Sequence, residues 1–353
     1  MPAPSPANRA GLGPRFAEAM RAAGAPWPAA VAVSGGSDSL ALMFLLCDWA
    51  KKARLPPPFV LCVDHQLRAG SAGDARQVRR WAKAAGLRGV ILVRKGEVPQ
   101  ADIEADAREA RYRLMGDWAS DNGVRAIYVG HTRDDQAETF LLRLARGSGV
   151  DGLSAMRTVS PYPLDGFGAL ALVRPLLDMD RNALRADLAA RGQPWLDDPM
   201  NADPRFARVK IRNAWPALEA AGLSKARIAN AAAHLLRARE ALEVASAAVL
   251  TRGCRLQGAD ALIDPVALIG APRELGLRSL ARVLMTVSQT HYRPRFERLE
   301  RLFDAILGGA LGAGRTLHGC RIGPAPAAIA LFGKGTLLIR REKSRRNAME
   351  SKD

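Results

Sequence analysis

The chain has 353 residues, of which 48% are hydrophobic, so it is long enough for two or three domains and too apolar to be disordered. Its 52 lysines and arginines outnumber 35 aspartates and glutamates, and the net charge of +17 favours a polyanionic partner, most simply nucleic acid. A solvated basic surface is the alternative. No apolar run is long enough to cross a membrane, and residues 1–15 lack the apolar core of a secretory signal.

The cysteines are scattered along the chain and form no closely spaced pair. They are Cys47, Cys62, Cys254 and Cys320. Zinc sites and disulfide frameworks use cysteines at characteristic spacings, which are absent from this sequence. We therefore expect reduced structural thiols, a cytoplasmic location and no membrane partner.

The amino-terminal region leads into a strand, a glycine turn and an apolar helix. Residues 1–14 are predicted as a loose arm and 16–23 as a short helix. A buried strand at 29–33 is followed by the sequence SGGSDS at 34–39 and a helix that continues to residue 50. Two adjacent glycines let the backbone approach a ligand closely, and the unpaired N–H groups of a helix start attract phosphate. An ordinary capped turn is the alternative.

Strands and helices then alternate. Further strands are predicted at 58–63, 89–94, 125–129 and 169–173. Helices are predicted between them at 71–86, at 101–120 and from about 134 to 146. This alternation predicts an α/β fold, a five-stranded parallel sheet with helices on both faces.

Polar residues follow three of these strands. SGGSDS follows the first strand, Asp64 and His65 follow the second, and Gly130 opens the sequence GHTRDD after the fourth. Parallel strands end at the same edge of a sheet, and ligands of such sheets bind beyond the carboxyl ends of the strands. The sequence therefore predicts a pocket at this edge.

Acidic residues in the sequence GHTRDDQAET suggest a metal or amine site. His131, Asp135 and Glu138 would share one helix face if the helix begins near His131. Asp38 and Asp135, beside a triphosphate, could hold Mg²⁺. The alternative is a capping cluster at the helix amino terminus.

Two further stretches carry charge that could serve a reaction. The helix at 101–120 bears one stripe of Glu104, Arg108, Arg111 and Tyr112, which is either a solvated face or a set of arginines that reach phosphate. The segment 195–212 has little helical periodicity, and its basic residues suit RNA phosphates. Those basic residues are Arg205, Arg208, Lys210 and Arg212.

Composition changes after residue 215. Long helices rich in alanine, leucine and arginine are predicted at 217–252 and 272–306, β-like runs at 315–340 and a charged tail at 341–353. The predicted divisions are an arm at 1–25, a catalytic domain at 26–215, a helical domain at 216–310 and a β module at 311–353.

Several motifs occur together in the order and spacing of one enzyme family. They are SGGSDS at 34–39, VDHQLR at 63–68, EADAREARY at 104–112, GHTRDDQAET at 130–139, RGSGVDGL at 146–153, RPLL at 174–177 and DPMNADPRFARVKIR at 198–212. Over about residues 29–212 the chain resembles the tRNA(Ile)-lysidine synthases, which are PP-loop ATP pyrophosphatases.

The resemblance implies an ATP-dependent ligase. ATP would adenylate the C2 oxygen of the wobble cytidine in tRNA(Ile) with a CAU anticodon, and free L-lysine would then displace AMP through its ε-amine. The modified tRNA reads AUA instead of AUG. The implied cofactors are ATP and Mg²⁺, and the helical domain is expected to bind the tRNA. A homodimer is one assembly that the sequence leaves open.

The resemblance also implies roles for individual residues. ATP is expected against Ser34, Gly35, Gly36, Ser37, Asp38, Ser39, Asp64, His65, Arg108 and Gly130. The expected catalytic residues are Asp38, Asp135, His131 and Arg111, with Asp38 and Asp135 on the metal. His131, Asp135 and Glu138 are the candidates for lysine recognition, and the sequence does not divide the roles among them.

Three other functions compete with this one. A PP-loop thiolase that sulfurates tRNA would need paired cysteines or an iron–sulfur cluster. An enzyme that amidates small molecules would have no use for the basic helical half. A non-catalytic RNA-binding protein would not require the intact SGGSDS motif with Asp38 and Asp135.

Overall fold

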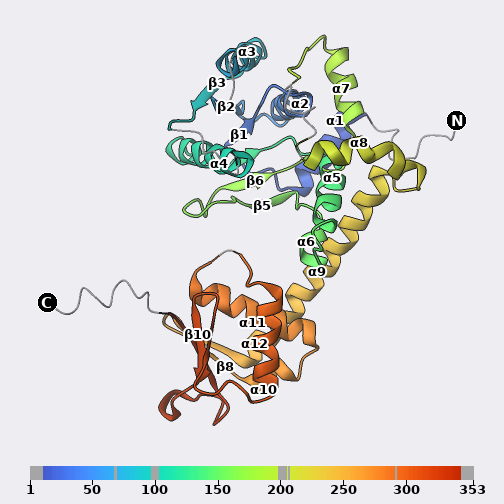
Figure 1. Ribbon diagram of the computed structural model, residues 1–353. Coiled ribbons are helices and arrows are strands. Elements are labelled where there is room, and N and C mark those ends of the chain that lie inside the picture. Colours follow the sequence, from blue (N-terminus) through green and yellow to red (C-terminus); the bar gives the residue numbers. More distant parts are fainter. Residues whose placement is uncertain are drawn as a thin grey trace. The chain divides into compact units, whose positions relative to one another are not determined.

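The computed structural model describes residues 11–66, 70–96, 103–197, 205, 207–290 and 292–342. The predictions for residues 1–10, for Arg68, for 198–204 and for the tail from 343 lie outside this part, as does the side chain of Glu104. The chain divides into two compact units, Met1–Leu236 and Arg237–Asp353, which are described separately (Figure 1). This division falls inside one long helix, and the domain boundaries predicted at 215 and 310 stay predictions.

The first unit alternates strands and helices. Its helices are α1 (Leu12–Ala22), α2 (Ser37–Lys52), α3 (Ser71–Ala84), α4 (Ile103–Asp121), α5 (Arg133–Leu144), α6 (Val150–Leu153), α7 (Arg181–Ala190), α8 (Ala207–Ala220) and the start of α9 (Lys225–Gly253). Its strands are β1 (Ala29–Ala32), β2 (Phe59–Asp64), β3 (Gly89–Val93), β4 (Ala126–Tyr128), β5 (Val159–Pro161) and β6 (Ala171–Val173).

The strands form one six-stranded sheet in the order β3-β2-β1-β4-β6-β5. The first five of these are parallel, with Val31 opposite Val60 on one side and Tyr128 on the other, which confirms the predicted doubly covered α/β sheet. The prediction missed β5, which pairs antiparallel with β6 at the edge. A three-residue strand that ends in proline has too short a pattern to detect, and an edge position tolerates the missing N–H.

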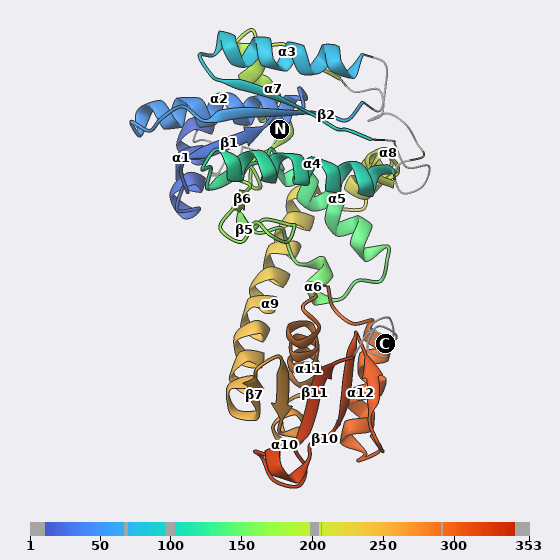
Figure 2. The same cartoon turned by 90° about the vertical axis from the view of Figure 1, so that its left-hand side faces the viewer.

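Alternate side chains of the strands enter two separate cores, as the period of two requires. Val31 and Tyr128 pack with α1, α2, α3 and α7 on one face. Ala30 and Ile127 pack with α4 on the other. Figure 2 shows the strands between α2 and α3 on one side and α4 on the other. This two-sided burial fixes the carboxyl ends of the strands at one edge.

Two helix boundaries differ from the predictions. Helix α1 begins at Leu12, inside the predicted arm, whereas α5 begins at Arg133, within one residue of its predicted start. Residues 207–212, predicted to be irregular, form the start of α8, because its buried Trp215 packs with Ala137 of α5 and Ile228 of α9. A tertiary contact of this kind outweighs weak local periodicity.

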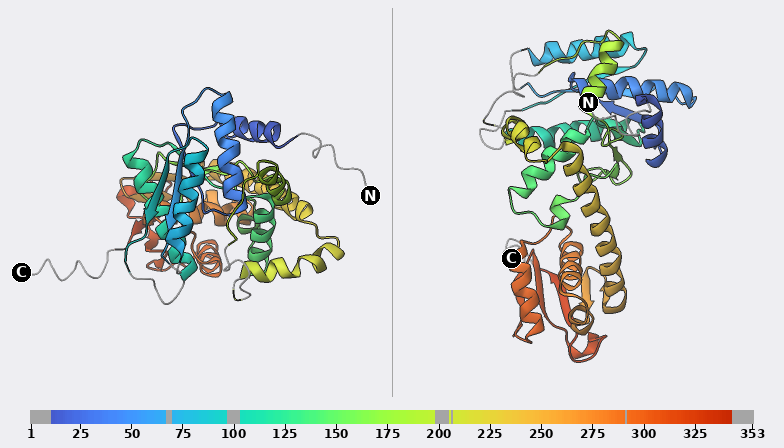
Figure 3. Two further views of the ribbon diagram at one scale, coloured as in Figure 1. Left: turned by 90° about the horizontal axis from the view of Figure 1, so that it is seen from above. Right: turned by 90° about the vertical axis from the view of Figure 1, so that its right-hand side faces the viewer.

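The second unit is a helical layer on an antiparallel sheet. After α9 come β7 (Cys254–Gln257), β8 (Asp260–Ile263), α10 (Pro265–Ile269), α11 (Arg273–Ser288), α12 (Phe296–Leu307), β9 (Arg315–Leu317), β10 (Cys320–Pro324), the 3₁₀ turn η3 (Ala327–Ile329) and β11 (Leu337–Arg341). The sheet order is β7-β8-β11-β10-β9. Helix α11 lies against this sheet (Figure 3, right), and Leu280 and Leu284 share one core with Ile339.

The predicted β module is therefore larger than the sequence indicates. Strands β7 and β8 come between the predicted helices, and β8 joins the carboxyl-terminal strands by pairing Leu262 with Leu338. In the described part of the chain, no helix combines the length and apolarity that a membrane span requires.

Candidate active site

A cavity of about 700 Å³ opens at the carboxyl ends of β1, β2 and β4. Many of the residues predicted from the sequence line it: Ser34, Gly36, Ser37, Asp38, Ser39, Asp64, His65, Arg111, Gly130, His131 and Asp135. Three other predicted residues, Gly35, Arg108 and Glu138, do not line it. The predicted pocket at this sheet edge is therefore present, without these three residues in its lining.

Two glycines allow close approaches at and beside the cavity wall. Gly35 has φ +95°, and a Cβ there would lie 2.6 Å from Cδ1 of Leu196. A Cβ on Gly130 would lie 2.9 Å from the carbonyl oxygen of Asp38, so the β4–α5 loop touches the first turn of α2. Both positions require glycine, the first for its backbone angle and the second for space.

Side-chain hydroxyls fasten the turn before α2. Ser39 Oγ donates a hydrogen bond to the carbonyl oxygen of Gly36 at 3.0 Å and accepts one from the backbone N–H of Ser34 at 3.2 Å. Because α2 begins at Ser37, the positive end of its dipole lies at the cavity wall. This arrangement suits the phosphate groups of a nucleotide.

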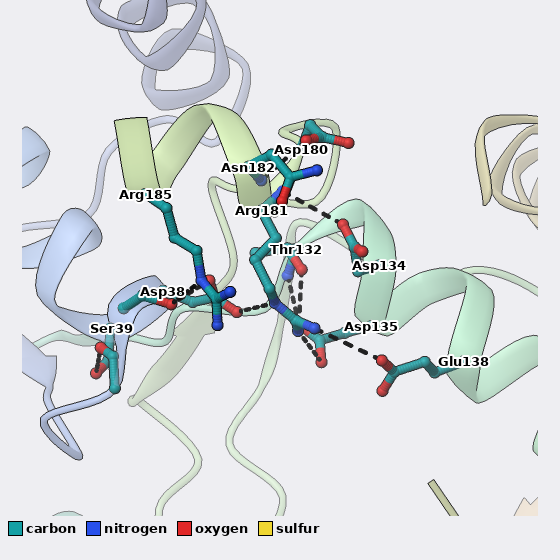
Figure 4. A network of polar contacts seen from close by, with 12 residues as sticks. Asp38, Ser39, Thr132, Asp134, Asp135, Glu138, Asp180, Arg181, Asn182 and Arg185 are labelled. Atoms are coloured by element: carbon teal, nitrogen blue, oxygen red, sulfur yellow. Dashed lines mark hydrogen bonds and ion pairs between the residues drawn. The ribbon is translucent and has the colours of Figure 1, made fainter. Parts of the chain in front are cut away.

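One arginine bridges the acidic residues of the site. Arg181, at the start of α7, donates from Nε to Oδ2 of Asp38 at 2.8 Å. Its Nη2 lies 3.5 Å from Oδ1 of Asp135, and its Nη1 lies 3.6 Å from Oε1 of Glu138. Figure 4 shows the guanidinium of Arg181 between these carboxylates.

Two arginines of α8 complete what we call the acid–arginine network: Asp38, Asp135, Glu138, Arg181, Arg208 and Arg212. Arg208 Nη1 lies 3.4 Å from Oδ1 of Asp135. Arg212 makes a bidentate pair with Glu138, with Nε 2.7 Å from Oε1 and Nη2 3.1 Å from Oε2. In this structure both arginines point toward α5, because they lie about one helical turn apart, and a role for them in binding RNA phosphates stays a prediction.

Asp135 also caps its own helix. Its Oδ2 accepts hydrogen bonds from the backbone N–H of Thr132 at 2.8 Å and from the Thr132 hydroxyl at 2.9 Å. His131 therefore precedes the helix, and the expectation that it shares a helix face with Asp135 and Glu138 is wrong. Capping uses Oδ2 and leaves Oδ1 to the arginines, so the capping alternative and a role in the site are compatible.

The neighbouring Asp134 connects three helices. It accepts hydrogen bonds from Nζ of Lys225 at 2.6 Å and from the backbone N–H of Arg181 at 3.3 Å. Burial alone would raise the pKa of Asp134, but the Lys225 hydrogen bond and charge, with Arg181, lower it. Asp134 therefore fixes α7 and α9 to the start of α5.

Both histidines of the cavity are held neutral. Burial, helped by the charges of Arg174 and Arg111, lowers the pKa of His131 to about 3 against the opposing effect of Asp135. Burial and the charges of Arg111 and Arg94 also lower the pKa of His65. Nδ1 of each histidine is buried without a hydrogen-bond partner among the described residues, which leaves it available to a ligand.

The two predicted arginines of α4 differ in position. Both guanidinium groups stack near Tyr112, Arg108 at 5.0 Å and Arg111 at 5.2 Å from the ring centre. Arg111 lines the cavity, and burial lowers its pKa. Arg108 is exposed and outside the lining, so the geometry favours Arg111 as the arginine that meets a ligand.

Helix α7 supplies site residues that were not predicted from the sequence. Arg185 also lines the cavity, and its Nε donates to Oγ of Ser37 at 3.2 Å. A signal was present, because the polar sequence DMDRNALR begins just beyond the four residues RPLL that follow the fifth predicted strand. Asp180 caps the helix by accepting from the backbone N–H of Asn182.

The donor set fits magnesium only if substrate oxygens complete it. Among the described residues, no group of three or more histidines, cysteines or carboxylates is arranged to hold a metal. Asp38 and Asp135 both contact Arg181. Burial, and to a smaller extent the negative charge of Asp135, raise the pKa of Asp38, although Arg181 opposes this effect. Mg²⁺ commonly takes one or two carboxylates together with phosphate oxygens and water, so this pair fits.

Comparison with known families agrees with the fold and the cavity. The PP-loop domain family matches residues 18–218, more than half of the chain. The first unit is therefore a PP-loop ATP-binding domain.

Individual relatives point to a more specific family among the proteins that contain this domain. The chain is 41% identical to the tRNA(Ile)-lysidine synthase of Methylobacterium nodulans, over 92% of this chain and 93% of that protein. It is 39% identical to the enzyme of that name from Ruegeria pomeroyi, over 82% and 70%, and 35% identical to the one from Wolbachia pipientis wMel, over 90% and 71%. This chain belongs to the tRNA(Ile)-lysidine synthase family.

A solved structure supports the fold alone. The U34-tRNA thiolase NcsA from Methanococcus maripaludis, determined with its [4Fe-4S] cluster, superposes with a TM-score of 0.51 and 15% identity. The match covers 64% of this chain and 78% of the thiolase. It indicates a shared architecture and carries no information on substrate.

Proposed function

We propose that this protein ligates L-lysine to C2 of the wobble cytidine of tRNA(Ile) with a CAU anticodon, at the cost of ATP. The observation that carries the proposal is that the glycine turn and the acid–arginine network meet in one cavity. A triphosphate is bound by positive groups and the amino groups of lysine by carboxylates, and the lining of this cavity contains both arginines and carboxylates. The family to which the chain belongs supports the same assignment.

The first step activates the base. The cytidine O2 attacks the α-phosphorus of ATP, the bond between that phosphorus and the bridging oxygen breaks, and pyrophosphate leaves. Arg181, Arg185 and Arg208 line the cavity and can turn from their present partners to the phosphates. Mg²⁺, held by Asp38 and Asp135 with phosphate oxygens, would neutralise charge on the departing pyrophosphate.

The second step forms the carbon–nitrogen bond. The ε-amine of lysine attacks C2, the C2–O2 bond breaks, AMP leaves with O2, and an amine proton passes to a carboxylate or to water. The charge of Arg111 disfavours an ammonium ion nearby, which promotes the reactive free amine, and Nδ1 of the neutral His131 can accept a hydrogen bond from that amine. Asp135 lines the cavity and is the better placed carboxylate for the amine. Glu138 is paired with Arg212, so it positions that arginine and can contact the amine only if the ion pair breaks.

The proposed setting is the cytoplasm, where ATP, free lysine and unmodified tRNA occur together. All four cysteines are free thiols, and burial raises the pKa of Cys62 to about 12. Among the described residues they do not gather into a cluster site, so a thiolase is not favoured. A homodimer stays a prediction that light scattering of the purified protein can check.

The deciding experiment incubates the protein with ATP, radiolabelled lysine and a panel of unmodified tRNAs. We expect label only in the isoleucine tRNA with a CAU anticodon. An Asp38→Ala variant is the control, and it should incorporate none. Absence of label with the wild-type protein, together with sulfur transfer to tRNA, would replace the proposal with the thiolase function.

A further inference from the structure

Helix α3 carries an uninterrupted basic face on the outside of the first unit. Arg76, Arg79, Arg80 and Lys83 follow the helical spacing of one stripe and are exposed. The opposite face, with Val78 and Ala82, is buried in the core. We call the four cations together with Arg88, which follows the helix, the α3 stripe.

The α3 stripe surrounds a shallow hollow of about 520 Å³. The hollow is lined by Arg79, Arg80, Lys83, Leu87, Arg88 and Gly89. Two of the cationic groups are held in place, since Arg80 Nε donates to Oε1 of Gln77 at 3.0 Å and the guanidinium of Arg88 lies 5.7 Å from the centre of the Phe59 ring. The charges therefore have defined positions at a concave surface.

The α3 stripe has no acidic counterpart. In the described part of the structure, none of its five cations forms an ion pair, whereas Arg191, the residue after α7, pairs with both Asp48 and Asp187. The helix dipole stabilises cations only in the last turn of a helix, so it explains the position of Lys83 but not those of the three arginines of α3. Like charges at this spacing destabilise a helix slightly, so fold stability does not explain the arrangement.

The α3 stripe starts at the rim of the candidate active site. Ser71, Asp74 and Ala75 of the first turn of α3 line the cavity. From there the four helical cations extend over about 10 Å, at 1.5 Å per residue. Figure 2 shows α3 along the outer border of this unit.

We propose that the α3 stripe binds the phosphate backbone of the RNA whose base enters the cavity. This inference rests on the proposed function. When the target base lies in the cavity, the sugar–phosphate backbone of the neighbouring nucleotides stays outside and passes over the rim. Exposed cations along one helix face suit phosphates, which position a nucleic acid without reading its sequence.

The test compares two triple variants in the full-length protein. Arg79→Gln, Arg80→Gln and Lys83→Gln remove three charges from the α3 stripe. Lys51→Gln, Lys52→Gln and Arg54→Gln remove three exposed charges from the end of α2, where the dipole accounts for them. Circular dichroism should show that both variants fold as the wild type does.

Binding to the isoleucine tRNA is then measured at about 50 and 200 mM salt. If the three cations contact phosphates, the slope of log affinity against log salt falls by about 2 to 3 in the α3 variant. The wild type then loses about 16- to 64-fold more affinity than this variant over that range. The α2 variant should keep the wild-type slope. Equal changes in both variants would overturn the proposal, because net charge alone would explain them.

Catalysis separates this inference from the proposed function. The α3 variant should raise KM for tRNA and leave kcat at saturating tRNA and the affinity for ATP unchanged. If the wild type makes no lysidine, the proposed function fails and the salt slopes still decide the α3 stripe. An unchanged slope, with reduced retention on phosphatidylserine vesicles, would assign the stripe to a membrane surface and overturn the RNA proposal.

Discussion

The acid–arginine network and the α3 stripe both contain arginines, but only those of the network are paired with acidic side chains in the described structure. In the network, Glu138 and Asp135 are buried and each meets arginines from other helices. In the α3 stripe, four exposed cations of one helix and the exposed Arg88 after it meet no acid among the described residues. Compensated buried charge gives a fixed site for chemistry, whereas uncompensated exposed charge gives salt-dependent attraction.

The comparison has an energetic consequence. Removing one partner from a buried pair leaves a charge without compensation, which costs far more than the loss of an exposed charge. Variants in the network should therefore change stability or chemistry strongly. Variants in the α3 stripe should change association and little else.

The largest effect is expected for Asp38→Ala. This carboxylate lines the cavity beside the glycine turn and contacts Arg181, so its loss should lower tRNA-dependent ATP–pyrophosphate exchange by about 1000-fold. Binding of tRNA should persist. Asp48→Ala, on the same helix but in a surface pair with Arg191, is the matched control and should stay active. Exchange that survives in Asp38→Ala would remove the network from the chemistry.

A smaller effect, on stability, is expected for Arg212→Met. Glu138 is 3% exposed, and without Arg212 it keeps only the longer contacts to Arg181 and Arg208, so the free energy of unfolding should fall by about 2–3 kcal/mol. Urea titration measures this. Arg239→Met, which breaks a partly exposed pair with Glu243, should cost under about 1 kcal/mol. Equal losses would contradict the contrast between buried and exposed charge.

A similar or slightly smaller loss should follow Gly130→Ala. The new Cβ would lie 2.9 Å from the carbonyl oxygen of Asp38, and relief requires backbone movement, so we expect about 1–3 kcal/mol of destabilisation. Gly36→Ala is the control, since its Cβ would meet nothing closer than Ser34 Oγ at 3.7 Å. If both variants unfold at the wild-type urea concentration, the close approach does not shape the site.

The smallest expected effect is a pH dependence from His131. Its folded pKa of about 3 lies below the ordinary 6.5, so its contribution to stability is complete above pH 6.5 and is lost as the pH falls toward 3. Between pH 6.5 and 5 the unfolding free energy of the wild type should fall more steeply than that of His131→Asn, by at most about 1.4 kcal/mol per pH unit. Parallel curves would show that His131 is not held neutral.

What the sequence predicted follows from local chemistry. The turn SGGSDS, Asp64 and Gly130 come directly after strands, and parallel strands bring their carboxyl ends to one edge, so their meeting follows from topology. The positions of the five parallel strands along the chain needed no tertiary information either. For these residues, a position directly after a strand is enough to predict that they lie at the carboxyl edge of the sheet.

What the sequence missed depends on contacts between distant segments. Arg181 reaches Asp38 across 143 positions of sequence, and nothing in its neighbours indicates that partner. Residues 207–212 become helical because α8 packs on α5 and α9, and this packing turns Arg208 and Arg212 toward acids instead of solvent. Strands β7 and β8 likewise become part of a sheet only through β11.

The most direct test of the account is to withhold lysine. Wild-type protein is incubated with Mg²⁺, ATP labelled in its α-phosphate and the isoleucine tRNA, and the tRNA is digested and analysed by mass spectrometry. We predict one AMP attached to the wobble cytidine, released when lysine is added as lysidine forms. AMP found on lysine with unmodified tRNA, or ATP cleaved without labelling the tRNA, would contradict activation of the base in this cavity.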